Sequence, residues 1–245
     1  MKFKLIIIVA LAVLIISIGT VSADENTTHD ETLKLDSTPC EILGIDTNDS
    51  VLTVGEDSFT SLQNTIDSAA PEDNITLEED YVYNTGFSTD GVSITKSVTI
   101  NGQGHTINAG SQSRAFTIAA DNVVLKDLSI INSGSGGAVT ITGNNVVLDN
   151  VTFNGCHSTG NGGAVHSTGK NTRIYDSDFI GCDSASGGAL YLGNTATVYG
   201  SQFINCTASN SAGAIYINAL CNVSNCIFDH NSALNGGDVY VAASE

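Results

Sequence analysis

A short motif that recurs at a nearly constant interval constrains the fold of this chain more than any other feature. A Gly-Gly-Ala triplet or a close variant begins at Gly136, Gly162, Gly187, Ala212 and Gly236, which lie 26, 25, 25 and 24 residues apart. A fixed period in this range indicates a repeat architecture in which each unit packs on its neighbours. Each interval has room for short strands and turns, and none for a helix.

A second motif runs in phase with the first and begins with phenylalanine at Phe153, Phe179, Phe203 and Phe228. After each triplet, apolar residues alternate with polar or aromatic ones, as in the segment 190–192 (Leu-Tyr-Leu). Each unit therefore has one apolar face, which it can bury only by stacking on the next unit. The pattern predicts an all-β parallel β-helix, and weaker repeats from about residue 96, with Ile130 in the phenylalanine place, bring the count to about six or seven coils.

The segment before the first coil has the pattern of a short amphipathic helix. In "TSLQNTIDSAAP", Thr60 and Gln63 have the spacing of a capping box, and Pro71 marks the end. Leu62, Ile66 and Ala69 would share one face. We expect this helix to cover the open first coil, because an uncovered end offers unpaired strand edges to other chains.

The N-terminal region differs in composition from the repeats. Residues 1–23 combine Lys2 and Lys4 with a run of about 15 apolar residues and small residues before Asp24, which is typical of a secretory signal and short for a membrane span. Residues 24–50 are polar, acidic and without period, and indicate a linker. We therefore expect a signal peptide at 1–23, a linker at 24–50 and a β-helix domain at 51–245.

Charge narrows the range of partners. Removing the signal leaves six basic and 26 acidic residues, a formal charge of −20, which repels nucleic acids and anionic lipids. We expect no nucleic-acid partner and contact with a membrane only through the signal segment. Six Asn-x-Ser/Thr triplets match the N-glycosylation pattern, either by chance in an Asn- and Thr-rich chain or as acceptors in a glycoprotein; they begin at Asn26, Asn48, Asn74, Asn150, Asn205 and Asn222.

The repeats resemble a known class of surface proteins. "GGAV", "GGAL" and "AGAI", together with "FINC" and "FDHN", are similar to the GGA(I/V/L) and FxxN repeats of β-helical adhesins, including bacterial polymorphic outer-membrane proteins. The signal and the segments "SFTSLQNTIDSA" and "ITKSVTINGQGHTI" are most similar to adhesin-like surface proteins of methanogenic archaea. The resemblance covers roughly residues 51–241 and implies a right-handed, pectate-lyase-like β-helix with an adhesive role. Cysteine replaces the FxxN asparagine three times.

Three of the six cysteines fall on one repeat position. Cys156, Cys182 and Cys206 should lie above one another at about the strand spacing. They can form a ladder of small buried residues, one disulfide between neighbours, or a metal site, and the ladder explains them most simply. No histidine accompanies this position, which argues against a catalytic thiol.

An aromatic series occupies the outward position of successive strands and consists of His166, Tyr191, Tyr216 and Tyr240. A row of rings on one outer face can contact sugars or aromatic side chains of a partner, and tyrosine also suits an exposed strand for structural reasons alone. These four residues are the candidate ligand-binding residues. Tyr175 and Tyr199 form a shorter pair on another face.

Catalysis by a polysaccharide lyase or glycosidase is the less favoured alternative. Asp176, Asp178 and Asp183 lie near Arg173 in one coil, without partner acids at the matching places of the next, and "GQGH" at 102–105 fits a turn. We expect no catalytic residues, cofactor or metal. The sequence favours a secreted or cell-surface protein that binds glycans or surface proteins; the alternatives are a structural spacer or a fragment of a larger surface protein, and a polysaccharide-degrading enzyme.

Overall fold

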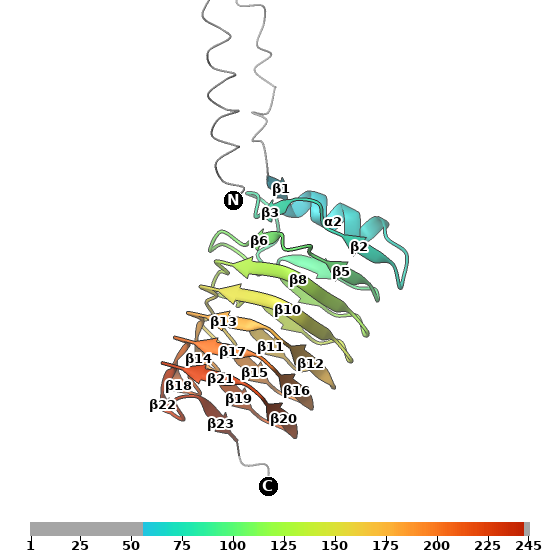
Figure 1. The fold of residues 1–245 in the computed structure, drawn as a ribbon. Coiled ribbons are helices and arrows are strands. Elements are labelled where there is room, and N and C mark those ends of the chain that lie inside the picture. Colours follow the sequence, from blue (N-terminus) through green and yellow to red (C-terminus); the bar gives the residue numbers. More distant parts are fainter. Residues whose placement is uncertain (1–55, 243–245) are drawn as a thin grey trace, which may run out of the picture. The chain divides into compact units, whose positions relative to one another are not determined.

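The computed structural model describes residues 56–242, which form a parallel β-helix with one short helix at its N-terminal end (Figure 1). The signal and linker predictions, and Cys40, lie outside the described residues. All ladders between named strands are parallel, and strands a coil apart pair in register. Seven strands stack in the second of three sheets, one from each coil, which confirms the predicted number of coils.

The first and largest sheet has 13 strands. They are β1 (Glu56–Ser58), β2 (Asn74–Thr76), β3 (Asp80–Val82), β5 (Thr99–Asn101), β6 (Thr106–Asn108), β8 (Val124–Ile131), β10 (Val147–Asn154), β12 (Thr172–Tyr175), β13 (Asp178–Ile180), β16 (Ala196–Tyr199), β17 (Gln202–Ile204), β20 (Cys221–Ser224) and β21 (Ile227–Asp229).

The second and third sheets form the other sides of the coil. The second contains β4 (Val92–Ile94), β7 (Phe116–Ile118), β9 (Val139–Ile141), β11 (Val165–Ser167), β15 (Leu190–Leu192), β19 (Ile215–Ile217) and β23 (Val239–Val241). The third contains β14 (Asp183–Ser186), β18 (Thr207–Ser211) and β22 (Ser232–Asn235), so it exists only in the last three coils.

The core is built from ladders of identical or similar side chains. The rings of Phe153 and Phe179 stack with centroids 4.9 Å apart, those of Phe179 and Phe203 4.7 Å apart, and those of Phe203 and Phe228 5.1 Å apart. Ile130, in the coil before, pairs with Phe153 and thus occupies the phenylalanine place, as predicted. The first three phenylalanines are fully buried, so the repeat period seen in the sequence is the period of the core.

The first sheet bends at one position in each of five coils, where a residue with left-handed backbone lies within β8 and β10 or between two consecutive strands. Asp127, Asn150, Asp176 and Asn225 have φ between 46° and 55°, and Gly200 has φ of 68°. Asn and Asp accept this conformation more readily than other residues with a Cβ. The side-chain amide of Asn150 donates to Oδ1 of Asp127 at 2.8 Å, which links neighbouring bends.

The glycine triplets form corners, and the first corner differs from the later ones. Gly162, Gly187 and Gly236 have φ of 62° to 67°, and Ala212 adopts 62° at the same place. In the earlier coil the positive φ belongs to Gly137, at 83°, and not to Gly136. A Cβ on Gly136 would lie 2.9 Å from Cζ of Arg114, so this glycine makes room for the Arg114 side chain.

The N-terminal helix α2 (Phe59–Ser68) covers the first coil with Phe59, Leu62 and Ile66 buried. The predicted capping box of Thr60 and Gln63 is wrong: the N-cap is Ser58, and Ser61 completes the box. The helix begins two residues earlier than an N-cap at Thr60 would require.

Gln63 has a different role, at the open edge of the second sheet. Its Nε2 donates to the carbonyl of Ser93 at 3.1 Å, and the Ser93 amide donates to its Oε1 at 2.7 Å. The side-chain amide thus occupies the place of a neighbouring strand's peptide beside β4. Because these edge groups are satisfied, the helix blocks pairing of β4 with another chain.

The last described coil is less buried than the others. Leu220, Ile227, Leu234 and Val241 are 86%, 56%, 79% and 63% exposed, and Phe228 is only partly buried. Phe228 and Val241 pair with Phe203 and Ile217 of the coil before, and within the described residues no coil follows to cover them. Ile227 pairs with Gln202 and therefore holds an outward position.

Candidate binding surface

The four predicted ring residues lie together on the outer face of the second sheet. Tyr191 and Tyr216 stack with centroids 4.9 Å apart and an interplanar angle of 10°, and Tyr216 and Tyr240 follow at 5.3 Å and 25°. His166 meets Tyr191 edge to face at 5.1 Å. We call these four residues the ring ladder. Parallel pairing in register sets their spacing, because each ring comes from the central residue of a strand.

Stacking changes what the ring ladder can offer to a ligand. Where two rings lie face to face, their faces contact each other and are closed to a sugar. The outer surface of the ladder therefore consists of ring edges and tyrosine hydroxyls. Among the described residues, Tyr83 is the tyrosine whose hydroxyl donates a hydrogen bond within the chain, to the carbonyl of Phe87 at 2.9 Å, and the ladder hydroxyls have no such partner.

The surroundings of the ring ladder are small and uncharged. In the strands before it, the same outward column holds Ser93, Thr117 and Thr140. The residues two positions after the outward ones form a second column. Gly193 belongs to it, and a Cβ on Gly193 would lie 3.5 Å from Cε1 of Tyr191. This column contains Thr142, Thr168, Gly193 and Asn218. The ring of Tyr191 leans over the space that glycine leaves free.

Two groups of the ring ladder, His166 and Tyr191, have pKa values shifted in the direction that favours the neutral form. Burial lowers the pKa of His166, and the positive charge of Arg114 lowers it further. Arg114 is itself paired with Asp90 and donates from Nε to the carbonyl of Gly136 at 3.0 Å. Burial raises the pKa of Tyr191, with a smaller effect from Tyr216. The ladder is therefore an uncharged surface near neutral pH.

The second pair of tyrosines lies on the first sheet. Tyr175 and Tyr199 are opposite each other in β12 and β16, and Tyr199 is 44% exposed. Residues in the next coils of this column are Asp149 and Ser224, so the pair does not extend into a longer series.

The cysteine column lies inside the β-helix. Cys156, Cys182 and Cys206 are buried free thiols, as the ladder interpretation expects. Hydrogen bonding with Cys156 and Cys206, together with full burial, raises the pKa of Cys182. Hydrogen bonding with Cys182 lowers the pKa of Cys156 and of Cys206. All three thiols are fully buried. The column is therefore part of the core.

Asn231, which follows Cys206 in the same repeat position, shows which hydrogen bonds the FxxN asparagine makes and which of them a cysteine can replace. Nδ2 of Asn231 donates to the carbonyl of Phe203 at 3.0 Å. One coil earlier, Sγ of Cys206 lies 3.4 Å from the carbonyl of Phe179, in the equivalent position. Asn231 also accepts from the amide of Cys206 at 2.9 Å, a bond that a thiol makes poorly.

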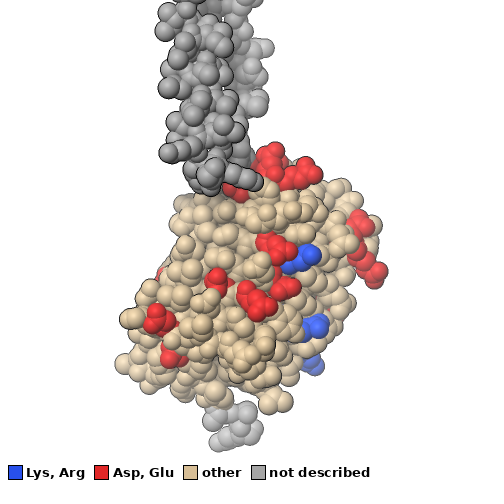
Figure 2. Space-filling view, in the orientation of Figure 1, with Lys and Arg blue, Asp and Glu red and all other residues tan. Residues whose placement is uncertain are grey.

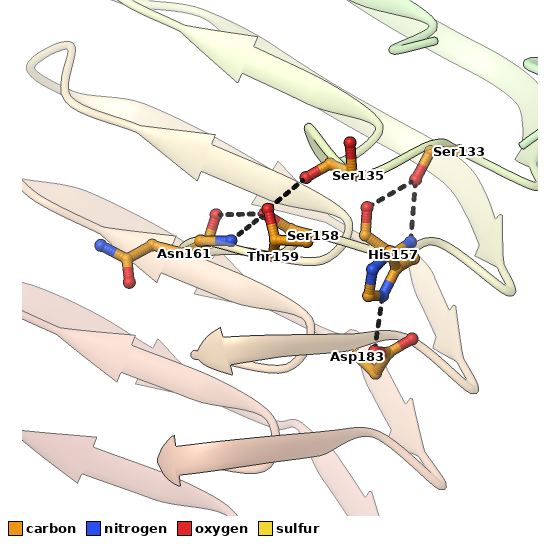
Figure 3. Close-up of polar contacts among 8 residues, drawn as sticks. Ser133, Ser135, His157, Ser158, Thr159, Asn161 and Asp183 are labelled. Atoms are coloured by element: carbon orange, nitrogen blue, oxygen red, sulfur yellow. Dashed lines mark hydrogen bonds and ion pairs between the residues drawn. The ribbon is translucent and has the colours of Figure 1, made fainter. Parts of the chain in front are cut away.

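A polar cluster near the start of the third sheet contains serine, histidine and aspartate (Figure 3). Nδ1 of His157 lies 2.7 Å from Oδ2 of Asp183 in the next coil. Oγ of Ser133 accepts from the backbone amide of His157 at 2.9 Å and does not face the ring, as Figure 3 shows. A catalytic triad places the serine on the second ring nitrogen. The cluster is a set of coil-to-coil contacts, and its His–Asp pair is about half exposed.

The acids of one coil remain without acidic partners in the next. Asp178 is paired with Thr152 and Gln202, and Asp183 with Thr207. Figure 2 shows acidic side chains scattered over the visible face with few basic ones. The register thus bears out the expectation from the sequence.

An open hollow of about 480 Å³ lies beside the turn at 102–105, where the sequence suggested only a turn. Four residues separate Asn101 from Thr106, whereas two separate their partners Lys126 and Ser129, so this turn contains two extra residues. The unequal spacing was the signal in the sequence for this feature. The hollow is lined by Asn101, Gln103, Gly104, Asp127, Leu128, Ser129, Asn150 and Thr152.

Not all six Asn-x-Ser/Thr triplets belong to the described residues, 56–242. Four of the glycosylation triplets fall within them, and all four asparagines are exposed: Asn74, Asn150, Asn205 and Asn222. In the range 56–242 there is no group of three or more His, Cys, Asp or Glu residues arranged to hold a metal ion. None of the helices described in that range has the length and apolar character needed to cross a membrane.

The N-terminal coils are similar to a known family. Residues 58–166 match the model of a family described as "Putative pectate lyase-like adhesive domain". No curated protein and no solved structure gives a significant match to the chain. The family match supports an adhesin-like β-helix, and it ends at His166, the first residue of the ring ladder.

Proposed function

We propose that this protein is a secreted or cell-surface adhesin-like β-helix that binds glycans or surface proteins through the ring ladder. The similarity of residues 58–166 to an adhesive domain supports the general role. The observation that carries the proposal is the continuous ladder of four rings on an uncharged face of a strongly acidic protein. The GGA and FxxN repeats also resemble those of adhesin-like surface proteins of methanogenic archaea.

Binding explains the chain better than catalysis does. Lyases of this fold act on acidic polysaccharides, which a net negative surface repels. The His157–Asp183 pair has no serine on its ring, and the acids near Arg173 have no acidic partners across the coils. A purely structural spacer would not need tyrosine in place of the threonines found earlier in the same column.

The test is binding of the purified protein to a glycan array and to whole cells. In the main variant, Tyr191, Tyr216 and Tyr240 are changed to threonine, which the column already contains at Thr140. The matched control changes Tyr175 and Tyr199 on the first sheet to threonine. We expect the main variant to lose binding and the control to keep it. Equal binding by both variants would contradict the ring ladder as the adhesive face, and absence of binding by the unchanged protein would favour the spacer.

A further inference from the structure

The ring ladder repeats a hydrogen-bonding group at a fixed interval along a straight line. Ring centroids follow one another at 5.1, 4.9 and 5.3 Å, since each ring belongs to one coil. The line runs along the axis of the β-helix, because strands stack in that direction. A ligand that contacts every ring must therefore be extended and must repeat at nearly the same interval.

The charge of this surface restricts the ligand further. The outward column and the column beside it contain hydroxyls, an amide, a glycine and a histidine held neutral. The nearby Arg114 is neutralised by Asp90. An anionic ligand would meet no positively charged side chain in these two columns and would be repelled by the rest of the acidic chain. The surface suits an uncharged ligand rich in hydroxyl groups.

We infer that the ring ladder binds an extended, uncharged, β-linked polysaccharide aligned with the axis of the β-helix, one sugar per coil. In extended β-1,4-linked chains the sugar rings follow one another at nearly the interval of the coils. Each sugar would exchange hydrogen bonds with one ladder position and would lie on the edges of the rings, because their faces are stacked on one another. This inference rests on the proposed function and specifies its ligand.

The periodic match predicts how affinity depends on ligand length. The probes are β-1,4-linked glucose and N-acetylglucosamine oligosaccharides of increasing length, titrated into the full protein by calorimetry. Affinity should rise about threefold to tenfold for each sugar added until all ladder positions are occupied, since each sugar gains about one net hydrogen bond. Further sugars should add little.

Two single variants test the register. Tyr216→Phe keeps the stacked ring and removes one interior hydroxyl. The affinity for the longest oligosaccharides should therefore fall about threefold to tenfold. Tyr240→Phe removes the terminal hydroxyl and should end the rise in affinity one sugar earlier. Neither change removes a ring from the stack, so circular dichroism and thermal unfolding should match the unchanged protein.

Bent ligands provide the matched control. α-1,4-linked glucose oligosaccharides have the same hydroxyls on a curved chain and should bind weakly at every length. Binding that is independent of length, or equal for α- and β-linked probes, would overturn the inference while leaving adhesion intact. Binding to proteins or to charged glycans alone would also overturn it. Loss of all binding would refute the proposed function itself, so the two failures are distinguishable.

Discussion

The first three and the last four coils share one core but present different outer surfaces. On the second sheet the early coils carry Ser93, Thr117 and Thr140, and the later coils carry the ring ladder. The third sheet also begins only with β14. Inward positions must fit the stack, whereas outward positions are free to change. A binding surface can therefore be confined to one half of a β-helix without altering its fold.

The two ends of the molecule differ as well. The first coil is covered by α2, and Gln63 satisfies the edge of β4. The last described coil leaves apolar side chains largely exposed, among them Leu220 and Leu234. The family match covers the capped half and stops where the ladder starts. The family match therefore concerns the capped coils. The residues proposed for binding lie almost entirely beyond it, with His166 as its last residue.

The largest expected effect concerns the core that both halves share. Phe179→Ala removes a fully buried ring stacked on both sides and should reduce the free energy of unfolding by about 3–5 kcal/mol. Phe228→Ala removes a partly buried ring with one stacked neighbour and should cost clearly less. Urea unfolding of both variants measures the difference. Equal losses would mean that the last coil is as well packed as the middle ones.

Substitutions at the corners of the later coils should change the free energy of unfolding by intermediate amounts. One of the two should destabilise the protein and the other should stabilise it. In Gly187→Ala the new Cβ would lie 2.1 Å from the Leu190 carbonyl at a φ of 67°, so the loss should exceed the cost of about 1–2 kcal/mol for left-handed backbone alone. Ala212→Gly relieves the same backbone and should stabilise by up to about 1 kcal/mol after the added chain entropy.

Gly181 provides the control for these corners. It has a φ of 58°, and a Cβ there would meet nothing within 4 Å. Gly181→Ala should therefore show the backbone cost without the clash. If Gly187→Ala is no worse than Gly181→Ala in thermal unfolding, the corner is looser than the structure indicates.

The sequence was sufficient for features that repeat. The phenylalanine ladder, the strands after each triplet and the ring ladder all follow from a period of about 25 residues, because parallel strands in register place equal positions above one another. The cysteine column follows for the same reason. No knowledge of distant contacts was needed, since each coil contacts mainly its neighbours.

Features that occur once could not be derived in this way. The partner of Gln63 is a strand edge 30 residues away, and its spacing from Thr60 matched a local motif that the helix does not use. The first corner has its positive φ at Gly137, and its Gly136 leaves room for Arg114 from the preceding coil, two features that the later repeats lack. The stacking of the ring faces depends on rotamers, which the sequence does not encode by spacing.

The smallest expected effect concerns His166, where the two kinds of outer surface meet. Its pKa is lowered, so the unfolded chain, with a histidine pKa of about 6.5, binds the proton more readily than the native protein does. The resulting stability is complete above that value and is lost as the pH falls through the lower, native pKa. His166→Thr extends the threonine series of the early coils and removes this dependence.

The advantage of the unchanged protein over His166→Thr should therefore shrink between about pH 8 and about pH 5 in urea unfolding. The other four histidines are the same in both proteins, so the difference isolates His166. A difference that grows on acidification would mean that His166 is stabilised in its charged form. The ring ladder would then begin with a positive charge, and an uncharged ligand would no longer be its natural complement.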